Sequence, residues 1–166
     1  GIRVGDEVLR ERYGALIIAT GARQVTLQEY LYGKHPGVMA QRDLETRISS
    51  LQSLDLQMVV MIQCVGSRDV AHPYCSRTCC AQAVKNALAL KELDPSSEVA
   101  ILFRDVRTMG MHELYYEEAR RQGVVFLEYG VERKPKVETR DSRLEVSVWD
   151  SGLADEIALP ADLVVL

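Results

Sequence analysis

Three short apolar runs alternate with two helix-like patterns in the middle of the chain. The runs cover residues 56–62, 99–103 and 124–127. Their continuous apolar character is typical of strands that are buried on both faces. Between them, apolar residues recur at helical spacing from Cys80 to about Leu93, and a second helix is expected over 113–122, closed by Gly123. This order predicts a parallel sheet with right-handed crossovers, a Rossmann-like core that we assign, with its cysteine loop, to residues 55–154.

The pattern changes beyond Lys136, where apolar and polar residues alternate with a period of two. Residues 137–139 and 144–148 form two such stretches, with a polar turn between them. Alternation of this kind predicts an antiparallel β-meander, which 157–159 would extend, and 163–166 predicts a further buried strand. The predicted fold class is therefore α/β, a Rossmann-like parallel sheet with an antiparallel β-meander.

An apolar run near the N-terminus predicts one more buried strand. The run covers residues 16–19 and ends in Thr20, Gly21 and Ala22, as in a strand that is closed by a glycine turn. A ligand could approach that glycine closely, but a tight turn after a core strand explains it as simply. The remaining patterns predict a hairpin or paired edge strands at 2–4 and 7–10, a loop at 24–39 and a short helix at 41–53.

Length and charge limit the function classes. The 166 residues predict a single domain, and a net charge of −4 without a stripe of Lys and Arg argues against nucleic-acid binding. No apolar run approaches the roughly 18 residues that span a bilayer, and the start lacks a signal peptide's apolar segment, so we expect a cytoplasmic protein. The chain begins without Met and ends on an apolar stretch at 162–166, which predicts a piece excised from a longer protein.

All four cysteines lie between the first apolar run and the helix that follows it. They form the pattern Cys-x10-Cys-x3-Cys-Cys at Cys64, Cys75, Cys79 and Cys80. Ligands of open parallel sheets bind at the carboxyl end of the strands, so the thiols occupy the ligand position. A nicotinamide-binding loop would need G-x-G-x-x-G there, whereas only Gly66 is present. In a reducing compartment, such a cluster of cysteines indicates metal or redox chemistry rather than structural disulfides.

Four thiolates can hold either one zinc ion or an iron–sulfur cluster. Zinc motifs generally separate paired cysteines by roughly two to four residues, whereas Cys79 and Cys80 are adjacent and their thiols tend to diverge. Adjacency therefore favours a [4Fe–4S] cluster. Zinc, with His72 as a substitute ligand, and buried or disulfide-forming cysteines remain the alternatives. The helix start, with Arg68 and Arg77 nearby in the sequence, would stabilise thiolates.

The cysteine stretch and several other segments of the chain resemble the A subunit of heterodisulfide reductase. The matching segments are 13–22, 61–68 and 74–80, with further agreement at 31–38, 103–108 and 159–165. The resemblance covers the whole chain, and the cysteine segment is its specific part. In that family, an FAD domain with a thioredoxin-reductase-like core is interrupted by a nicotinamide-domain-like unit. The resemblance implies that this chain is that unit, with junction strands at 1–22 and 161–166 leading into a missing FAD domain.

The resemblance also implies cofactors and partners. It implies a [4Fe–4S] cluster on Cys64, Cys75, Cys79 and Cys80, and an FAD site of the full-length protein bordered by Thr20, Gly21 and Ala22. The expected role is an electron relay in an iron–sulfur flavoprotein oxidoreductase of anaerobic energy metabolism, with the isolated chain inactive and free of FAD. Expected partners are the remainder of the FAD domain and other iron–sulfur or hydrogenase-type subunits. A zinc-stabilised structural or interaction module is the alternative.

Overall fold

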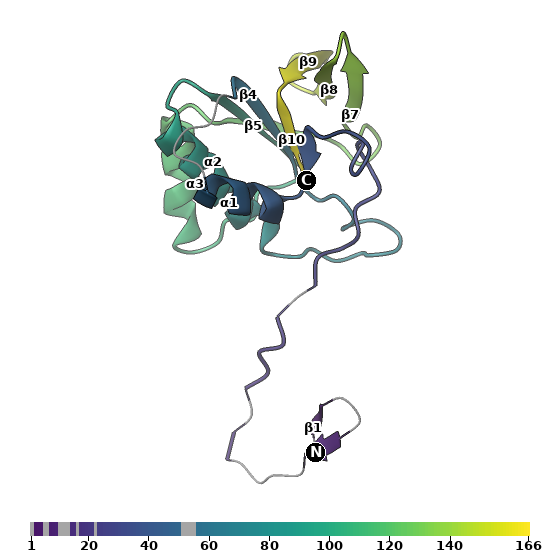
Figure 1. The fold of residues 1–166 in the computed structure, drawn as a ribbon, viewed down its shortest axis with the longest axis vertical. Coiled ribbons are helices and arrows are strands. Elements are labelled where there is room, and N and C mark those ends of the chain that lie inside the picture. The colour runs from purple at the N-terminus through teal and green to yellow at the C-terminus, as the bar shows by residue number, and fades with distance from the viewer. Residues whose placement is uncertain (1, 5–6, 10–13, 16, 22, 51–55) are drawn as a thin grey trace.

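A five-stranded parallel sheet forms the centre of the molecule in the computed structural model, which describes residues 2–4, 7–9, 14–15, 17–21, 23–50 and 56–166. The strand order is β3-β10-β4-β5-β6, and every neighbouring pair is parallel. The strands are β3 (Val38–Met39), β10 (Leu163–Val165), β4 (Met58–Ile62), β5 (Glu98–Phe103) and β6 (Val125–Glu128). Figure 1 shows this sheet between a layer of helices and a second, smaller sheet.

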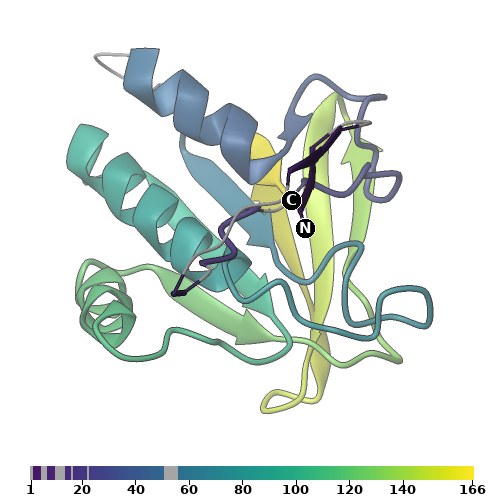
Figure 2. The same ribbon diagram turned by 90° about the horizontal axis from the view of Figure 1, so that it is seen from below.

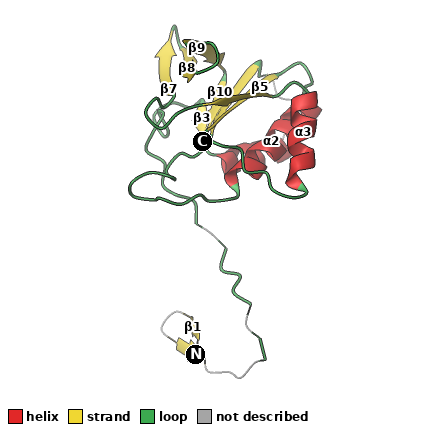
Figure 3. Cartoon of the chain, turned by 180° about the vertical axis from the view of Figure 1, so that it is seen from behind, coloured by secondary structure: helices red, strands yellow, loops and turns green. Residues whose placement is uncertain are grey.

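The helical layer covers one face of the parallel sheet. It consists of α1 (Gln41–Ser50), α2 (Cys79–Leu93) and α3 (His112–Arg121), which lie together on that side in Figures 2 and 3. Val59 and Met61 of β4 pack into the same buried cluster as Val84 and Leu90 of α2. These contacts explain the helical spacing of apolar residues after Cys79, because that spacing gives α2 one apolar face.

The opposite face is covered by an antiparallel meander of β7 (Lys136–Arg140), β8 (Arg143–Asp150) and β9 (Asp155–Ala161). Val60 and Ile62 of β4 share a second buried cluster with Leu144 and Val146 of β8. Successive side chains of β4 therefore enter the two different cores, since strand side chains alternate between faces. This burial on both faces accounts for the continuously apolar sequence of the strand.

The predicted fold class is confirmed, including the parallel core, both of its crossover helices and the meander. The predicted helix at 41–53 is found as α1, and its last predicted residues, 51–53, lie outside the described part of the chain. The sequence analysis missed β3, a two-residue strand in the predicted loop at 24–39. β3 forms because Val38 and Met39 pair with Val164 and Val165 of β10, a contact between distant parts of the sequence.

The N-terminal segment holds one confirmed prediction and one error. β1 (Ile2–Val4) and β2 (Glu7–Leu9) pair antiparallel, as expected for a hairpin, while Gly5 and Asp6 between them lie outside the described residues. The prediction of a buried strand at 16–19 is wrong for residues 17–19, and Leu16 lies outside the described part of the chain. Residues 17–21 belong to no helix or strand, and Ile17 and Ile18 are 89% and 79% exposed. An apolar run is buried only where other elements pack on it, and here none of the described elements does.

Candidate metal centre

The cysteine loop leaves the carboxyl end of β4, in the middle of the parallel sheet. The Gln63 amide donates to the Leu102 carbonyl at 2.9 Å, which extends the pairing with β5 by one residue. Cys64, Gly66 and Arg68 then adopt positive φ angles of 63°, 66° and 57°. Left-handed backbone at a non-glycine residue costs about 1 kcal/mol or more and persists only where surrounding contacts hold it. The chain therefore turns sharply out of the sheet at Cys64, the first predicted ligand.

The first two residues of α2 are Cys79 and Cys80. The preceding residue, Thr78, makes no capping hydrogen bond with its side chain. The Cys79 sulfur accepts hydrogen bonds from the Cys80 thiol, the Ser76 hydroxyl and the backbone N–H groups of Cys64 and Cys80. These donors, led by the Cys80 thiol, lower the pKa of Cys79 to about 6. Cys79 is thus stabilised as a thiolate, the form that binds metals.

Cys80 is the buried member of the pair, with 6% of its surface exposed. Its pKa is raised, first because its thiol donates to Cys79 and second because burial disfavours its thiolate. The sulfur lies 3.9 Å from the Asp105 carbonyl oxygen.

Cys64 follows β4 by two residues and Cys79 and Cys80 begin α2, while Cys75 lies on the loop between them. Its sulfur accepts the Arg77 amide at 3.3 Å. In the described part of the chain, no three His, Cys, Asp or Glu side chains surround a common point closely enough to hold a metal ion. The donor chemistry of four thiols fits a thiolate-ligated group, although the described side chains do not converge on one point. The ligand assignment therefore stays a prediction.

The loop after β5 packs against the cysteine loop. The Asp105 carboxylate binds Arg68 of the cysteine loop through one oxygen and Arg107 through the other, the second contact at 2.7 Å. Arg104 donates to the Arg68 carbonyl at 2.7 Å. The sequence analysis missed Asp105. Its position just beyond a strand next to β4 was the available signal, because neighbouring parallel strands deliver their following loops to the same edge.

A cavity of about 240 Å³ lies beside Cys64. It is lined by Tyr30, Arg68, Arg104, Tyr129 and Lys134, among others. The Tyr129 hydroxyl donates to the Gln63 carbonyl, and burial raises the pKa of this tyrosine. The cavity is smaller than the roughly 300 Å³ at which small-molecule sites begin.

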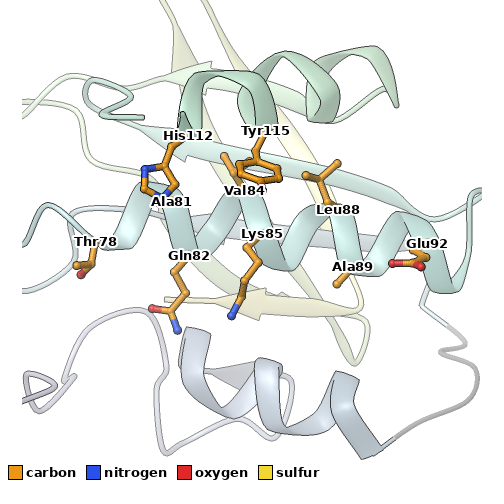
Figure 4. Close-up of a pocket in the computed structure, with 10 residues that line it drawn as sticks. All are labelled: Thr78, Ala81, Gln82, Val84, Lys85, Leu88, Ala89, Glu92, His112 and Tyr115. Carbon is orange, nitrogen blue, oxygen red and sulfur yellow. The ribbon is translucent and has the colours of Figure 1, made fainter. Parts of the chain in front are cut away.

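A larger groove of about 670 Å³ runs along the outside of α2, starting at Thr78. Figure 4 shows His112 and Tyr115 of α3 on one side of this groove, and Gln82 and Lys85 pointing toward α1 on the other. Both of these side chains bind Glu45 of α1, Gln82 at 3.1 Å. The predicted FAD-bordering residues are not part of either cavity: Thr20 and Gly21 are exposed, and Ala22 lies outside the described residues.

The fold and the site together define an α/β domain of dinucleotide-binding architecture with a thiol-rich loop at the carboxyl edge of its parallel sheet. Its fold resembles that of L-lysine 6-monooxygenase from Pseudomonas syringae, with a TM-score of 0.51 and 12% identity over 89% of this chain and 43% of that one. No family model matches the sequence.

Related sequences give the more particular result. The iron-sulfur A subunit of CoB–CoM heterodisulfide reductase from Methanocaldococcus jannaschii is 38% identical over 96% of this chain. The A subunit of the H2/formate:CoB–CoM heterodisulfide,ferredoxin reductase from Methanococcus maripaludis is 36% identical over 95% of it. The chain spans only 27% of the length of each of these relatives. These matches confirm the expected resemblance: the chain is related to a segment of the A subunits of heterodisulfide reductases.

Proposed function

We propose that this chain is the electron-relay domain of an FAD- and iron–sulfur-dependent oxidoreductase of the heterodisulfide reductase type. The observation that carries the proposal is the thiol-rich loop at the carboxyl edge of β4, which begins near Cys64 and leads into Cys79 and Cys80 at the start of α2. A relative of this chain is named as an iron-sulfur subunit, which agrees with thiolates at that edge. The domain would then hold a [4Fe–4S] cluster where a nucleotide-binding domain holds its glycine-rich turn.

The four cysteines have separate parts in this proposal. Cys79 is poised as a thiolate at the start of α2, Cys80 is buried beside it, and the sharp turn fixes Cys64. Cys75, on the loop between Cys64 and Cys79, would be the fourth ligand. A bound [4Fe–4S] cluster would supply a site that takes up and releases single electrons. The residues of the chain would hold it, exclude solvent on the Cys80 side and adjust its potential through hydrogen bonds to the sulfurs.

The same proposal gives the N-terminal segment a role. Ile17 and Ile18 are apolar and exposed, as expected for a segment that packs against another domain. We propose that residues 1–22 and 161–166 connect to an FAD domain, and that Thr20, Gly21 and Ala22 border its FAD in the full-length protein. β10 pairs with β3 and β4, so the connection at that end begins from within the parallel sheet. Other iron–sulfur or hydrogenase-type subunits would exchange electrons with the assembly.

Single cysteine-to-serine variants test the ligand assignment. Each of Cys64→Ser, Cys75→Ser, Cys79→Ser and Cys80→Ser is reconstituted anaerobically with iron and sulfide and compared with Ser67→Ala, a matched control in the same loop. We expect the control to take up as much iron and sulfide as the unchanged chain, and each serine variant to lose or alter the cluster. Normal clusters in all four serine variants would refute the assignment. Stoichiometric zinc without sulfide in the unchanged chain would support the zinc-stabilised structural module instead.

A further inference from the structure

The carboxylate of Asp105 joins two elements that are far apart in the sequence. One oxygen binds Arg68, four residues after Cys64, and the other binds Arg107 on the loop after β5. The Arg68 side chain is 23% exposed and that of Asp105 is 44% exposed, so the pair is partly shielded from water. Asp105 therefore connects the loop after β5 to the middle of the cysteine loop.

The backbone around Asp105 contacts the first turn of α2 at the same time. The Asp105 carbonyl oxygen lies 3.9 Å from the Cys80 sulfur. A single short segment thus contacts a predicted ligand through its main chain and the cysteine loop through its side chain. Any displacement of this segment would alter both contacts.

Arg68 is also the point at which the cysteine loop folds back on itself. Its amide donates to the Tyr74 carbonyl at 3.2 Å, and its own carbonyl accepts the Arg104 side chain at 2.7 Å. With φ at +57°, Arg68 has a backbone conformation that needs such external support. Its ion pair with Asp105 supplies part of that support.

We propose that Asp105 is a positioning residue, which acts through Arg68 and Arg107 to hold the cysteine loop in place against Cys80 and α2. The redox consequence of this role rests on the proposed iron–sulfur function, whereas the structural consequence does not. Arg68, Asp105 and Arg107 together carry one net positive charge. That charge lies next to the site and favours the more negative, reduced state of a group bound there.

Two single variants and their combination separate charge from position. Asp105→Asn raises the net charge of Arg68, Asp105 and Arg107 by one, because it removes a negative charge. Arg68→Gln lowers that net charge by one, and the double variant restores it. In the reconstituted 166-residue chain we expect the reduction potential to rise in Asp105→Asn, to fall in Arg68→Gln and to return toward its original value in the double variant. Chelator-driven iron loss should be about two- to fivefold faster in all three, because each lacks the ion pair. Glu145→Gln, which breaks an ion pair with Arg140 on the meander, is the matched control and should change neither property.

Hydrogen exchange of the cluster-free chain tests the positioning role without any cofactor. The amides of Ser67, Arg68 and Asp69 are hydrogen-bonded within the loop, and we expect them to exchange about two- to fivefold faster in Asp105→Asn than in the unchanged chain. Unchanged exchange would overturn the proposal, as would potentials that shift in the same direction in both single variants. Altered exchange in a chain that takes up no iron would support the positioning role while refuting the proposed function.

Discussion

Cys79 and Cys80 are neighbours in sequence but hold their protons very differently. Cys79 accepts hydrogen bonds from four groups, whereas Cys80 donates to Cys79 and is buried under the loop after β5. A thiolate beside a protonated thiol leaves one sulfur ready to bind metal and the other protected until a metal displaces its proton. The division of roles follows from the start of α2, where the two residues face different surroundings.

The pKa of Cys79 can be measured through its reaction with iodoacetamide. In the reduced, cluster-free chain we expect the alkylation rate of Cys79 to rise with a midpoint near pH 6, below the ordinary thiol value of 9.0. Because the folded pKa is the lower one, the thiolate's contribution to stability is fully present above the unfolded pKa and is lost as the pH falls through about 6. Tandem mass spectrometry of alkylated peptides assigns the rate to Cys79.

Two variants at Cys80 identify the cause of that shift. Cys80→Ala removes the principal donor to Cys79, so the midpoint should move up toward the ordinary value, while Cys80→Ser keeps a donor and should hold the midpoint low. Equal midpoints in the two variants would show that the Cys80 side chain is not what lowers the pKa.

At the scale of elements, β4 determines where the cysteine loop begins. Met58–Ile62 is sandwiched between the helices and the meander, and the strand pairs with β10 on one side and β5 on the other. Such a strand has no freedom to shift its register, since a one-residue slip would exchange the side chains of the two cores. Cys64 is therefore placed by a rigid support, two residues beyond the strand.

Truncation of a β4 side chain measures how strongly this support is held. Met61 is fully buried, so Met61→Ala should lower the free energy of unfolding by about 2–5 kcal/mol through lost burial and a residual cavity. Met109→Ala is the matched control, because Met109 is 68% exposed and its truncation should change stability by less than about 0.5 kcal/mol. Urea denaturation followed by circular dichroism gives both values, and similar losses in the two variants would contradict the described burial of β4.

At the scale of the whole molecule, the predictable features are those that repeat locally. The period of 3.6 in α2 and of two in β8 could be recognised from sequence, because each reflects the faces of a single element. The insertion of β10 between β3 and β4 could not, since it depends on pairing between residues roughly a hundred or more positions apart. The apolar run at 16–19 shows the converse error: its composition predicts burial, but burial also needs a partner surface.

In the candidate site, too, the sequence predicts the local features but not those that depend on contacts between distant residues. The sequence places Cys64, Cys75, Cys79 and Cys80 close together along the chain and correctly puts Cys79 at the start of a helix. It does not show which thiols meet, because that depends on the turn at Cys64 and on the loop after β5. For Asp105 the sequence offers only its position just beyond a strand, since its contact with Arg68 arises only when β4 and β5 pair side by side.

Iron and sulfide analysis of the anaerobically reconstituted chain, with electron paramagnetic resonance of the dithionite-reduced sample, tests the central claim most directly. We predict about four irons and about four sulfides per chain, because the four cysteines would hold one [4Fe–4S] cluster. At low temperature the reduced sample should give the signal of a reduced [4Fe–4S] cluster. A chain that binds no iron under these conditions and instead holds one zinc ion, or only disulfides, would contradict the electron-relay function.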